Sequence, residues 1–162
     1  MSEMIANKTI EKPVVLTSDP MLIAKLYAKI PTREIQSQMG QLVRELSAEL
    51  ERQQIAPAGP WFTHHLRKPA EYFDFEVCFP VATPVKANGR VEPAEWPAMK
   101  MVRTVYHGSY EGLAAGWGEF MAEVDSMGLR VSPEIWEVYK VGPDAEADPA
   151  KWQTELSRAI LA

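Results

Sequence analysis

The chain has 162 residues, 46% of them hydrophobic, and its 17 basic and 22 acidic side chains give a formal charge of -5 at pH 7. This length supports one sizeable core but not two ordinary domains, so we expect a single domain over residues 1–162. An acidic chain without a basic run is a poor surface for nucleic acid, no stretch approaches the roughly 20 apolar residues of a membrane span, and the N-terminus lacks the apolar core of a signal peptide. The composition therefore predicts a cytoplasmic protein that by itself binds neither nucleic acid nor membrane.

The first predicted elements are a broken strand and an amphipathic helix. Residues 13–31 contain two apolar runs separated by a Ser-Asp-Pro turn, so we expect a strand that is bent or broken near Asp19. From Thr32 to about Gln54, apolar side chains recur every three or four residues, which predicts a one-sided helix with Thr32 as its N-cap. The sequence PAGP at residues 57–60 prevents its continuation.

Two strands are predicted after this helix, within WFTHHL (residues 61–66) and EYFDFEVCFPV (residues 71–81). The second alternates between an apolar face and a mixed face. The apolar face carries Phe73, Phe75, Val77 and Phe79, and the other carries Tyr72, Asp74, Glu76 and Cys78. Residues 82–98 contain several Pro and Gly residues and are predicted to be a linker.

The second half of the chain repeats this order. A strand is predicted within residues 99–107, followed by a helix that begins after Ser109, its proposed N-cap, and ends at Gly128. The apolar stripe of this helix is Leu113, Trp117, Phe120, Met121 and Val124. Two further strands are predicted within residues 136–141 and 152–161.

The order strand, helix, strand, strand therefore occurs twice, and we interpret it as a weak internal duplication. We predict an α+β fold in which two βαββ units, over about residues 10–85 and 97–162, form one antiparallel sheet. Two helices would cover one face of that sheet. The seam between the halves would leave a concave region for a ligand on the other face.

Glu137 is the first candidate for chemistry because it stands in the apolar stretch PEIWEVYK, residues 133–140. On a strand, Trp136 and Val138 face one way and Glu137 and Tyr139 the other. If the tryptophan face packs on the helices, the glutamate lies on the opposite side of the sheet. A solvated strand face would explain this pattern. The alternative is a carboxylate in an aromatic-lined cavity, where a low dielectric strengthens its attraction for a cation and burial raises its pKa toward acid–base work.

Aromatic residues outside the helical stripes favour a cavity. Trp61, Trp96 and Trp152 fall in turns or at strand starts, whereas Trp117 has helical spacing and is assigned to the core. Tyr110, in the first turn of the second helix, can direct its hydroxyl into the seam, although a half-buried surface tyrosine gives the same pattern.

Three glycines interrupt the second helix, and each costs it about 1 kcal/mol relative to alanine. They are Gly112, Gly116 and Gly118. We expect something to approach this backbone closely, and prefer a neighbouring strand to a ligand.

Histidine, cysteine and known motifs indicate neither a metal site nor a cofactor. His64 and His65 are adjacent and point to opposite faces of a strand, so they cannot chelate one ion together. The single Cys78 cannot form an internal disulfide, in agreement with a reducing compartment, and we assign it to the core or the seam. No phosphate-binding glycine loop, GxSxG or HExxH motif is present. We predict no metal and no cofactor.

Three motifs, in this order, resemble one known family. FDFEVCFPV, VYHGSYEGL and PEIWEVYK with WQTEL after it are similar to GyrI-like small-molecule-binding domains, the effector-binding domains of multidrug-responsive regulators. The likeness covers about Lys12 to Leu161. It implies a duplicated βαββ fold with a ligand cleft at the pseudo-twofold seam, and a glutamate, here Glu137, that meets cationic lipophilic ligands. The family often has glycine in place of Cys78, which leaves the surroundings of that strand open.

Members of that family act in three contexts: fused to a DNA-binding domain, as stand-alone ligand binders or gyrase inhibitors, and as hydrolases of strained cyclopropane rings. Few residues precede the domain and the charge is acidic, so the fused role is not expected for this chain alone. We predict a stand-alone domain that binds a hydrophobic, cationic or polarised small molecule between Glu137 and aromatic walls. The candidates for these walls are Tyr110, Tyr139, Trp61, Trp96 and Trp152.

A hydrolase is the alternative, with Glu137 as general base on water and Tyr110 or Tyr139 stabilising the oxygen that gains charge. A gyrase inhibitor that acts through protein contact is a minor alternative. The ligand, and whether the chain pairs with a second copy or with a separate regulator protein, stay open at the level of sequence.

Overall fold

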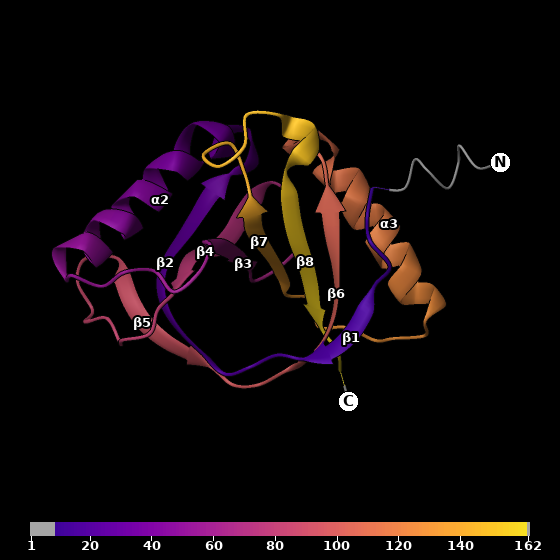
Figure 1. The fold of residues 1–162 in the computed structure, drawn as a ribbon, viewed down its shortest axis with the longest axis horizontal. Coiled ribbons are helices and arrows are strands. Elements are labelled where there is room, and N and C mark those ends of the chain that lie inside the picture. The colour runs from indigo at the N-terminus through magenta and orange to yellow at the C-terminus, as the bar shows by residue number, and fades with distance from the viewer. Residues whose placement is uncertain (1–8, 162) are drawn as a thin grey trace.

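A computed structural model describes residues 9–161, which form one antiparallel sheet of eight strands with two α-helices on one of its faces (Figure 1). The strands are β1 (Val14–Thr17), β2 (Met21–Pro31), β3 (Phe62–His65), β4 (Tyr72–Pro80), β5 (Val91–Trp96), β6 (Lys100–His107), β7 (Ile135–Val141) and β8 (Gln153–Ala159). The α-helices are α2 (Ile35–Arg52) and α3 (Leu113–Ser126), and 3-10 turns occupy Thr32–Glu34, Tyr110–Gly112 and Pro149–Lys151.

The order of elements confirms the predicted α+β class. Across the sheet the strands follow the order β1-β6-β8-β7-β3-β4-β2-β5. The succession βαββ occurs twice, as β2-α2-β3-β4 and as β6-α3-β7-β8. The two units meet where β3 pairs with β7 at the centre of the sheet, and β5 and β1 extend its two edges.

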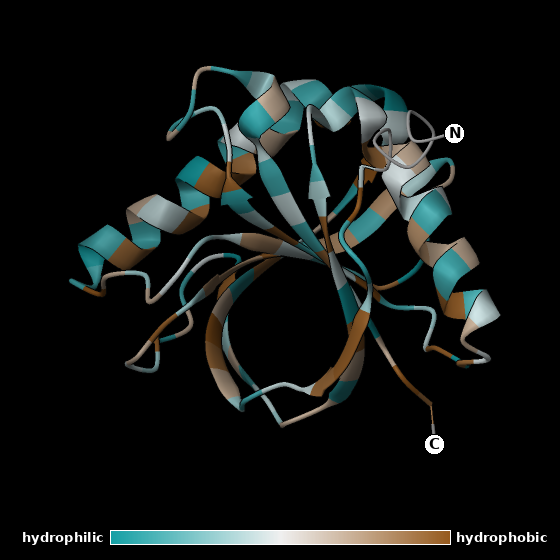
Figure 2. Cartoon of the chain, turned by 45° about the vertical axis from the view of Figure 1, so that its right-hand side comes forward, coloured by the Kyte–Doolittle hydropathy of each residue, from teal (hydrophilic) through white to brown (hydrophobic). Residues whose placement is uncertain are grey.

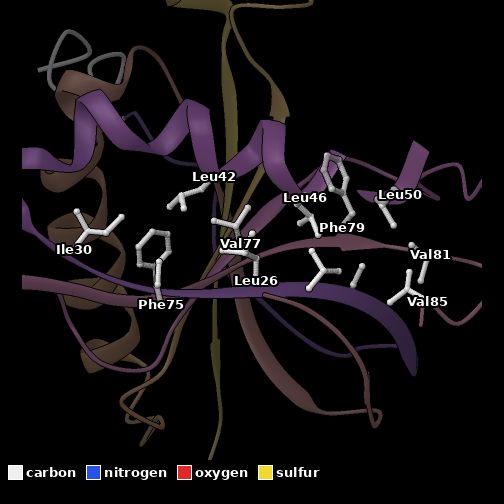
Figure 3. Close-up of a cluster of buried hydrophobic side chains, with 13 residues drawn as sticks. Leu26, Ile30, Leu42, Leu46, Leu50, Phe75, Val77, Phe79, Val81 and Val85 are labelled. Atoms are coloured by element: carbon white, nitrogen blue, oxygen red, sulfur yellow. The ribbon is translucent and has the colours of Figure 1, made fainter. Parts of the chain in front are cut away.

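Strand pairing shows which side chains face the helices. Val77 pairs with Thr63, Thr63 with Glu137 and Glu137 with Leu156, and side chains of directly paired residues lie on the same face. Val77 belongs to the core beneath α2 (Figure 3) and Leu156 to the core beneath α3. Glu137 therefore faces the helix layer, at the middle of the sheet.

Trp136 lies on the opposite face, where it packs with Phe62 and Cys78. The arrangement considered from the sequence, with the tryptophan face under the helices and Glu137 in a cleft on the other side, is therefore wrong. The sheet is strongly curved, and its two ends bend toward each other on the face away from the helices (Figure 2). This curvature encloses the Trp136 face without a second layer of helices.

Each helix covers one end of the sheet with its own core. Leu42, Leu46 and Leu50 repeat every four residues on α2 and pack on β2 and β4 (Figure 3). Phe120 and Val124 of α3 pack on β6 and β8. Neither of these two cores takes a buried residue from the helix face of β3 or β7. The centre of the sheet is thus left between two separate hydrophobic cores.

The glycines of α3 allow a close approach to β6. A Cβ atom added at Gly116 would lie 2.6 Å from a ring carbon of Tyr106, and one added at Gly112 would meet the Tyr106 hydroxyl, whereas one at Gly118 would meet nothing within 4 Å. The expected close neighbour is thus the Tyr106 side chain of a strand, at two of the three glycines. Gly128 ends this part of the chain with a φ of 71°, a left-handed conformation that favours glycine.

Two local predictions are wrong. Residues 82–98 are not only a linker, because they contain β5, which pairs with β2 at the sheet edge. Its Pro93 is tolerated because an edge strand needs hydrogen bonds on one side only. Thr32 is not the N-cap of the first helix but the first residue of the 3-10 turn before α2, and its hydroxyl donates to the carbonyl of Ala70 at 2.5 Å. Ser109 occupies the predicted N-cap position, before the 3-10 turn that leads into α3, but its side chain makes no capping hydrogen bond; its carbonyl accepts a hydrogen bond from the Tyr106 hydroxyl at 2.7 Å.

Candidate functional site

A pocket of about 640 Å³ opens on the helix face, bounded by α3, the central strands and the connection from β3 to β4. Its walls are largely apolar and include Phe73, Leu113, Trp117, Met121 and Ile135. Glu137 supplies the acidic side chain among its lining residues, and His65, Lys68 and Arg158 supply the basic ones. Concave, mostly apolar sites with a few polar groups are typical of small-molecule binding.

The carboxylate of Glu137 is held by two donors. The indole Nε1 of Trp117 donates to Oε2 at 2.6 Å, and the hydroxyl of Tyr139 donates to Oε1 at 2.6 Å. Because the Tyr139 proton is used in this way, the Thr63 hydroxyl donates to the Tyr139 oxygen, at 2.9 Å. These bonds fix the orientation of the carboxylate at the edge of the pocket.

Burial and hydrogen bonding act on Glu137 in opposite directions. Burial raises the pKa of its carboxyl, whereas the hydrogen bonds from Tyr139 and Trp117 favour the charged form, and the net pKa lies above the ordinary value. Burial and the neighbouring Glu137 raise the pKa of Tyr139 well above its usual range, so Tyr139 stays protonated and can donate. The site therefore holds a proton-accepting carboxylate in a poorly solvated setting.

Four of the predicted aromatic residues form one group beside Glu137. The rings of Trp61 and Tyr139 stack with centroids 4.2 Å apart, Tyr139 contacts Tyr110 edge-on at 6.0 Å, and Tyr110 contacts Trp152 at 5.0 Å. These rings pack on one another instead of lining the pocket, so they support Tyr139 and one end of the site. Trp152 is fixed further because its Nε1 donates to the carbonyl of Glu146 at 2.8 Å.

Trp96, the fifth predicted aromatic residue, lies on the other face of the sheet. It contacts Trp136 edge-on at 5.7 Å and Phe62 at 5.3 Å, and these rings border a separate pocket of about 410 Å³. The structure therefore does not bring Trp96 together with Glu137. The strand carrying Trp96 had been predicted as linker, so its side could not be assigned from the pattern.

The two histidines point to opposite faces, as predicted. His64 lies on the Trp136 face with its ring nitrogens 3.0 Å from Glu76 and 2.7 Å from Glu134. His65 lies on the helix face, where burial lowers its pKa to about 4, so it is neutral at pH 7. Within residues 9–161, no group of three or more His, Cys, Asp or Glu side chains is arranged to hold a metal ion.

Apart from Lys68 on the β3–β4 connection, the polar pocket residues that sequence reasoning does not find are Trp117, His65 and Arg158. Trp117 was assigned to the core, because helical spacing cannot show that its indole N–H points at Glu137. His65 was considered only as a metal ligand, and Arg158 appeared as an ordinary charged residue of the last strand. Their common signal is their place on the helix face of β3, α3 and β8, which depends on the pairing of distant strands.

The sequence of residues 11–159 matches the model of the GyrI-like small molecule binding domain. The chain belongs to the GyrI-like family. Among proteins with curated descriptions, none matches this GyrI-like chain at a significant level. None of the helices in residues 9–161 is long and apolar enough to cross a membrane.

Solved structures agree with this membership at the level of the fold. The C-terminal domain of EcmrR superposes with a TM-score of 0.81 at 19% identity, covering 92% of this chain and 96% of that domain. In the EcmrR-DNA complex the TM-score is 0.84 at 18% identity, covering 98% of this chain, which spans 60% of the EcmrR chain.

Two more distant neighbours carry descriptions of function. A hydrolase from Listeria innocua, encoded by lin2189, superposes with a TM-score of 0.60 at 12% identity, covering 99% of this chain and 97% of that one. SAV2435 bound to tetraphenylphosphonium superposes with a TM-score of 0.60 at 9% identity, covering 94% of this chain and 95% of that one. At these identities the likeness establishes the fold and leaves the ligand to be argued from the site itself.

Proposed function

We propose that this GyrI-like domain binds a hydrophobic, cationic small molecule in the helix-face pocket, with Glu137 as its charge partner. The observation that carries the proposal is a fixed carboxylate at the edge of a largely apolar pocket. In such a setting the attraction between a carboxylate and a cation is several times stronger than in water, and the Trp117 ring offers a π face to a cationic ligand. The tetraphenylphosphonium bound by SAV2435, a protein of the same fold, is a ligand of this chemical class.

The test compares a cation with a neutral molecule of similar aromatic size. Tetraphenylphosphonium and triphenylphosphine oxide are titrated against the protein while tryptophan fluorescence is followed. We expect Glu137→Gln to weaken tetraphenylphosphonium about tenfold or more, as for a lost charge-assisted contact, and triphenylphosphine oxide less than about threefold.

The control is Glu95→Gln, which makes the same change at an exposed residue of the edge strand β5. It should alter neither affinity. An equal loss of both ligands in Glu137→Gln would refute the charge role of Glu137, and no binding of either ligand by the wild type would refute the pocket as a site for lipophilic cations.

A second candidate function, hydrolysis of a strained cyclopropane, is favoured by the raised pKa of Glu137. A carboxylate with a raised pKa is a better base toward water. In the proposed step, Glu137 takes a proton from water while the water oxygen bonds to a ring carbon of a ketone-conjugated cyclopropane. The ring C–C bond breaks, its electron pair moves to the carbonyl oxygen as an enolate, and the protonated Glu137 returns the proton to the product.

This reaction is tested by incubating the protein with a spirocyclopropyl dienone and analysing the products by mass spectrometry. A hydrolase yields a ring-opened product heavier by one water, and Glu137→Gln abolishes it. Recovery of intact compound at the rate of the protein-free control would exclude this activity and leave the binding function.

A further inference from the structure

We propose that the ligand carries an acidic group in addition to its cationic aromatic body, and that Arg158 and Lys68 hold this acidic group. The proposal rests on the binding function above and narrows its ligand to amphoteric aromatic molecules. The proposal follows from the position and the hydrogen bonds of these two basic residues, and from the lack of an acidic partner for either of them within residues 9–161.

Arg158 is a partly buried cation that has no anionic partner among residues 9–161. Its Nε and Nη2 donate to the carbonyl of Ser132 at 3.1 and 2.7 Å, and its Nη1 lies 3.2 Å from the sulfur of Met121. These contacts use three of the five N–H donors of a guanidinium, so two are left without an acceptor among residues 9–161. Burial is also the one cause that shifts the pKa of Arg158, and it shifts this pKa downward.

A buried charge without a counter-charge is uncommon, because removal from water is costly unless the charge is paired. The other partly buried arginine of the described sheet shows the usual arrangement, since Arg103 lies 3.4 Å from the carboxylate of Glu155. Arg158, by contrast, borders the pocket instead of a carboxylate of the described chain. A ligand anion in that space would supply the partner that the described residues do not.

Lys68 adds a second positive charge to the same pocket. It lies on the connection from β3 to β4 with an exposed side chain, and it forms no ion pair within the described part of the chain. With Glu137 ionised and His65 neutral, the lining residues carry one negative and two positive charges. This excess of positive charge favours a ligand that carries an anionic group in addition to its cation.

The spacing of the charges suits a single ligand. Glu137 pairs with Leu156, so Arg158, two residues further along β8, lies diagonal to Glu137 on the same face. Diagonal neighbours in an antiparallel pair have Cα atoms about 7–8 Å apart. One aromatic molecule can therefore place a cationic group near the Glu137 carboxylate and a carboxylate near the Arg158 guanidinium, which binds carboxylates through paired N–H groups.

The experiment uses two fluorescent dyes that differ in one group. Rhodamine 110 has a free carboxylate beside its cationic xanthene, and rhodamine 123 is the methyl ester of the same dye. Dissociation constants are measured by fluorescence anisotropy for the wild type, Arg158→Met, Lys68→Met and the control Lys140→Met, which removes an exposed charge from β7. Urea unfolding confirms that each variant is folded.

We expect the wild type to bind rhodamine 110 about tenfold more tightly than rhodamine 123, a ratio typical of a charge-assisted contact. Arg158→Met should remove this preference by weakening rhodamine 110 alone. Lys68→Met, an exposed residue whose replacement does not threaten folding, should weaken rhodamine 110 about threefold because its charge is more solvated. Lys140→Met should change neither dye.

Binding of rhodamine 123 by the wild type as tightly as rhodamine 110, or more tightly, would overturn the inference. An equal loss of affinity for both dyes in Arg158→Met would also overturn it, because Arg158 would then only anchor Ser132. In both cases, binding of rhodamine 123 that depends on Glu137 would leave the proposed function standing. Failure of both dyes and of tetraphenylphosphonium to bind would refute the proposed function, and the inference with it.

Discussion

Replacement of Gly116 by alanine should destabilise the protein, although alanine is the better helix former. Gly116 is a buried residue of α3, and an added Cβ would lie 2.6, 3.1 and 3.3 Å from three carbons of the Tyr106 ring. That ring cannot easily move aside, because Tyr106 is only 3% exposed and its hydroxyl donates to the Ser109 carbonyl at 2.7 Å. The helix must therefore lift from the sheet.

The magnitude follows from two opposing effects. Carbon atoms in contact prefer a separation of about 3.5–4.0 Å, so the new methyl group requires a shift of about 1 Å. Overpacking costs about 1–3 kcal/mol, and a contact as short as 2.6 Å places this site in the upper part of that range, at about 2–3 kcal/mol. The gain in helix propensity from glycine to alanine offsets about 1 kcal/mol of this cost. We expect a net loss of about 1–2 kcal/mol in the free energy of unfolding, which lowers a urea midpoint by about 0.5–1 M.

Gly118→Ala is the matched control, two residues along the same helix. Its Cβ would meet nothing within 4 Å, so only the propensity gain applies and stability should rise by about 0.5–1 kcal/mol. Urea unfolding of both variants, followed by circular dichroism, measures the two changes. Gly116→Ala as stable as the wild type, or changes of the same sign in both variants, would refute the close contact between α3 and β6.

Three further predictions concern the site and its surroundings. Trp117→Phe should lower the free energy of unfolding by about 1–3 kcal/mol, because it leaves a buried carboxylate oxygen of Glu137 without its donor. The same replacement should cost much less in a Glu137→Gln background. Additive effects of the two replacements in a double-mutant cycle would contradict the Trp117–Glu137 hydrogen bond. The folded-state pKa of His65 lies at about 4, below the ordinary value of 6.5, so its contribution to stability is present above pH 6.5 and is lost as the pH falls toward 4. In urea unfolding we expect the wild type to lose about 2 kcal/mol of stability by pH 4.5 and His65→Phe to lose less. Identical pH profiles of the two proteins would exclude this role of His65. Cys78 is fully buried and burial raises the pKa of its thiol, so it should not react with a disulfide reagent at pH 8 until the protein is unfolded in guanidinium. Rapid reaction of the native protein would show that β4 opens.

The main elements could be predicted from sequence because each follows a local rule. The apolar repeat of α2, the alternation of β4 and the glycine after α3 all depend on residues close together in the chain. Strand β5 was missed because Pro93 argues against a strand unless the strand is known to lie at an edge. Edge position is decided by the pairing of β5 with β2, some seventy residues earlier in the chain, which no local pattern records.

The orientation of Glu137 could not be predicted for a related reason. Both faces of β7 carry large aromatic residues, so alternation shows that Trp136 and Glu137 differ in side but not which side meets the helices. The Trp136 face is buried because the sheet curls over it, a property of all eight strands together (Figure 2). The usual inference, that the more apolar face lies beneath the helices, fails in a sheet that buries both faces by different means.

The place of the site follows from the way the two cores are divided. Each helix packs over the outer strands of its own half, and neither of the two cores takes a buried residue from the helix face of β3 or β7. Polar side chains such as Thr63, Glu137 and Tyr139 are tolerated there because they hydrogen-bond one another. A sheet made of two such units thus leaves a polar strip at its centre, and α3 supplies Trp117 to that strip from one side only. The pocket lies on that α3 side, with no α2 residue in its lining, and this asymmetry between two otherwise similar halves explains why Glu137, in the second half, lines a site while Thr63, its partner in the first, supports it.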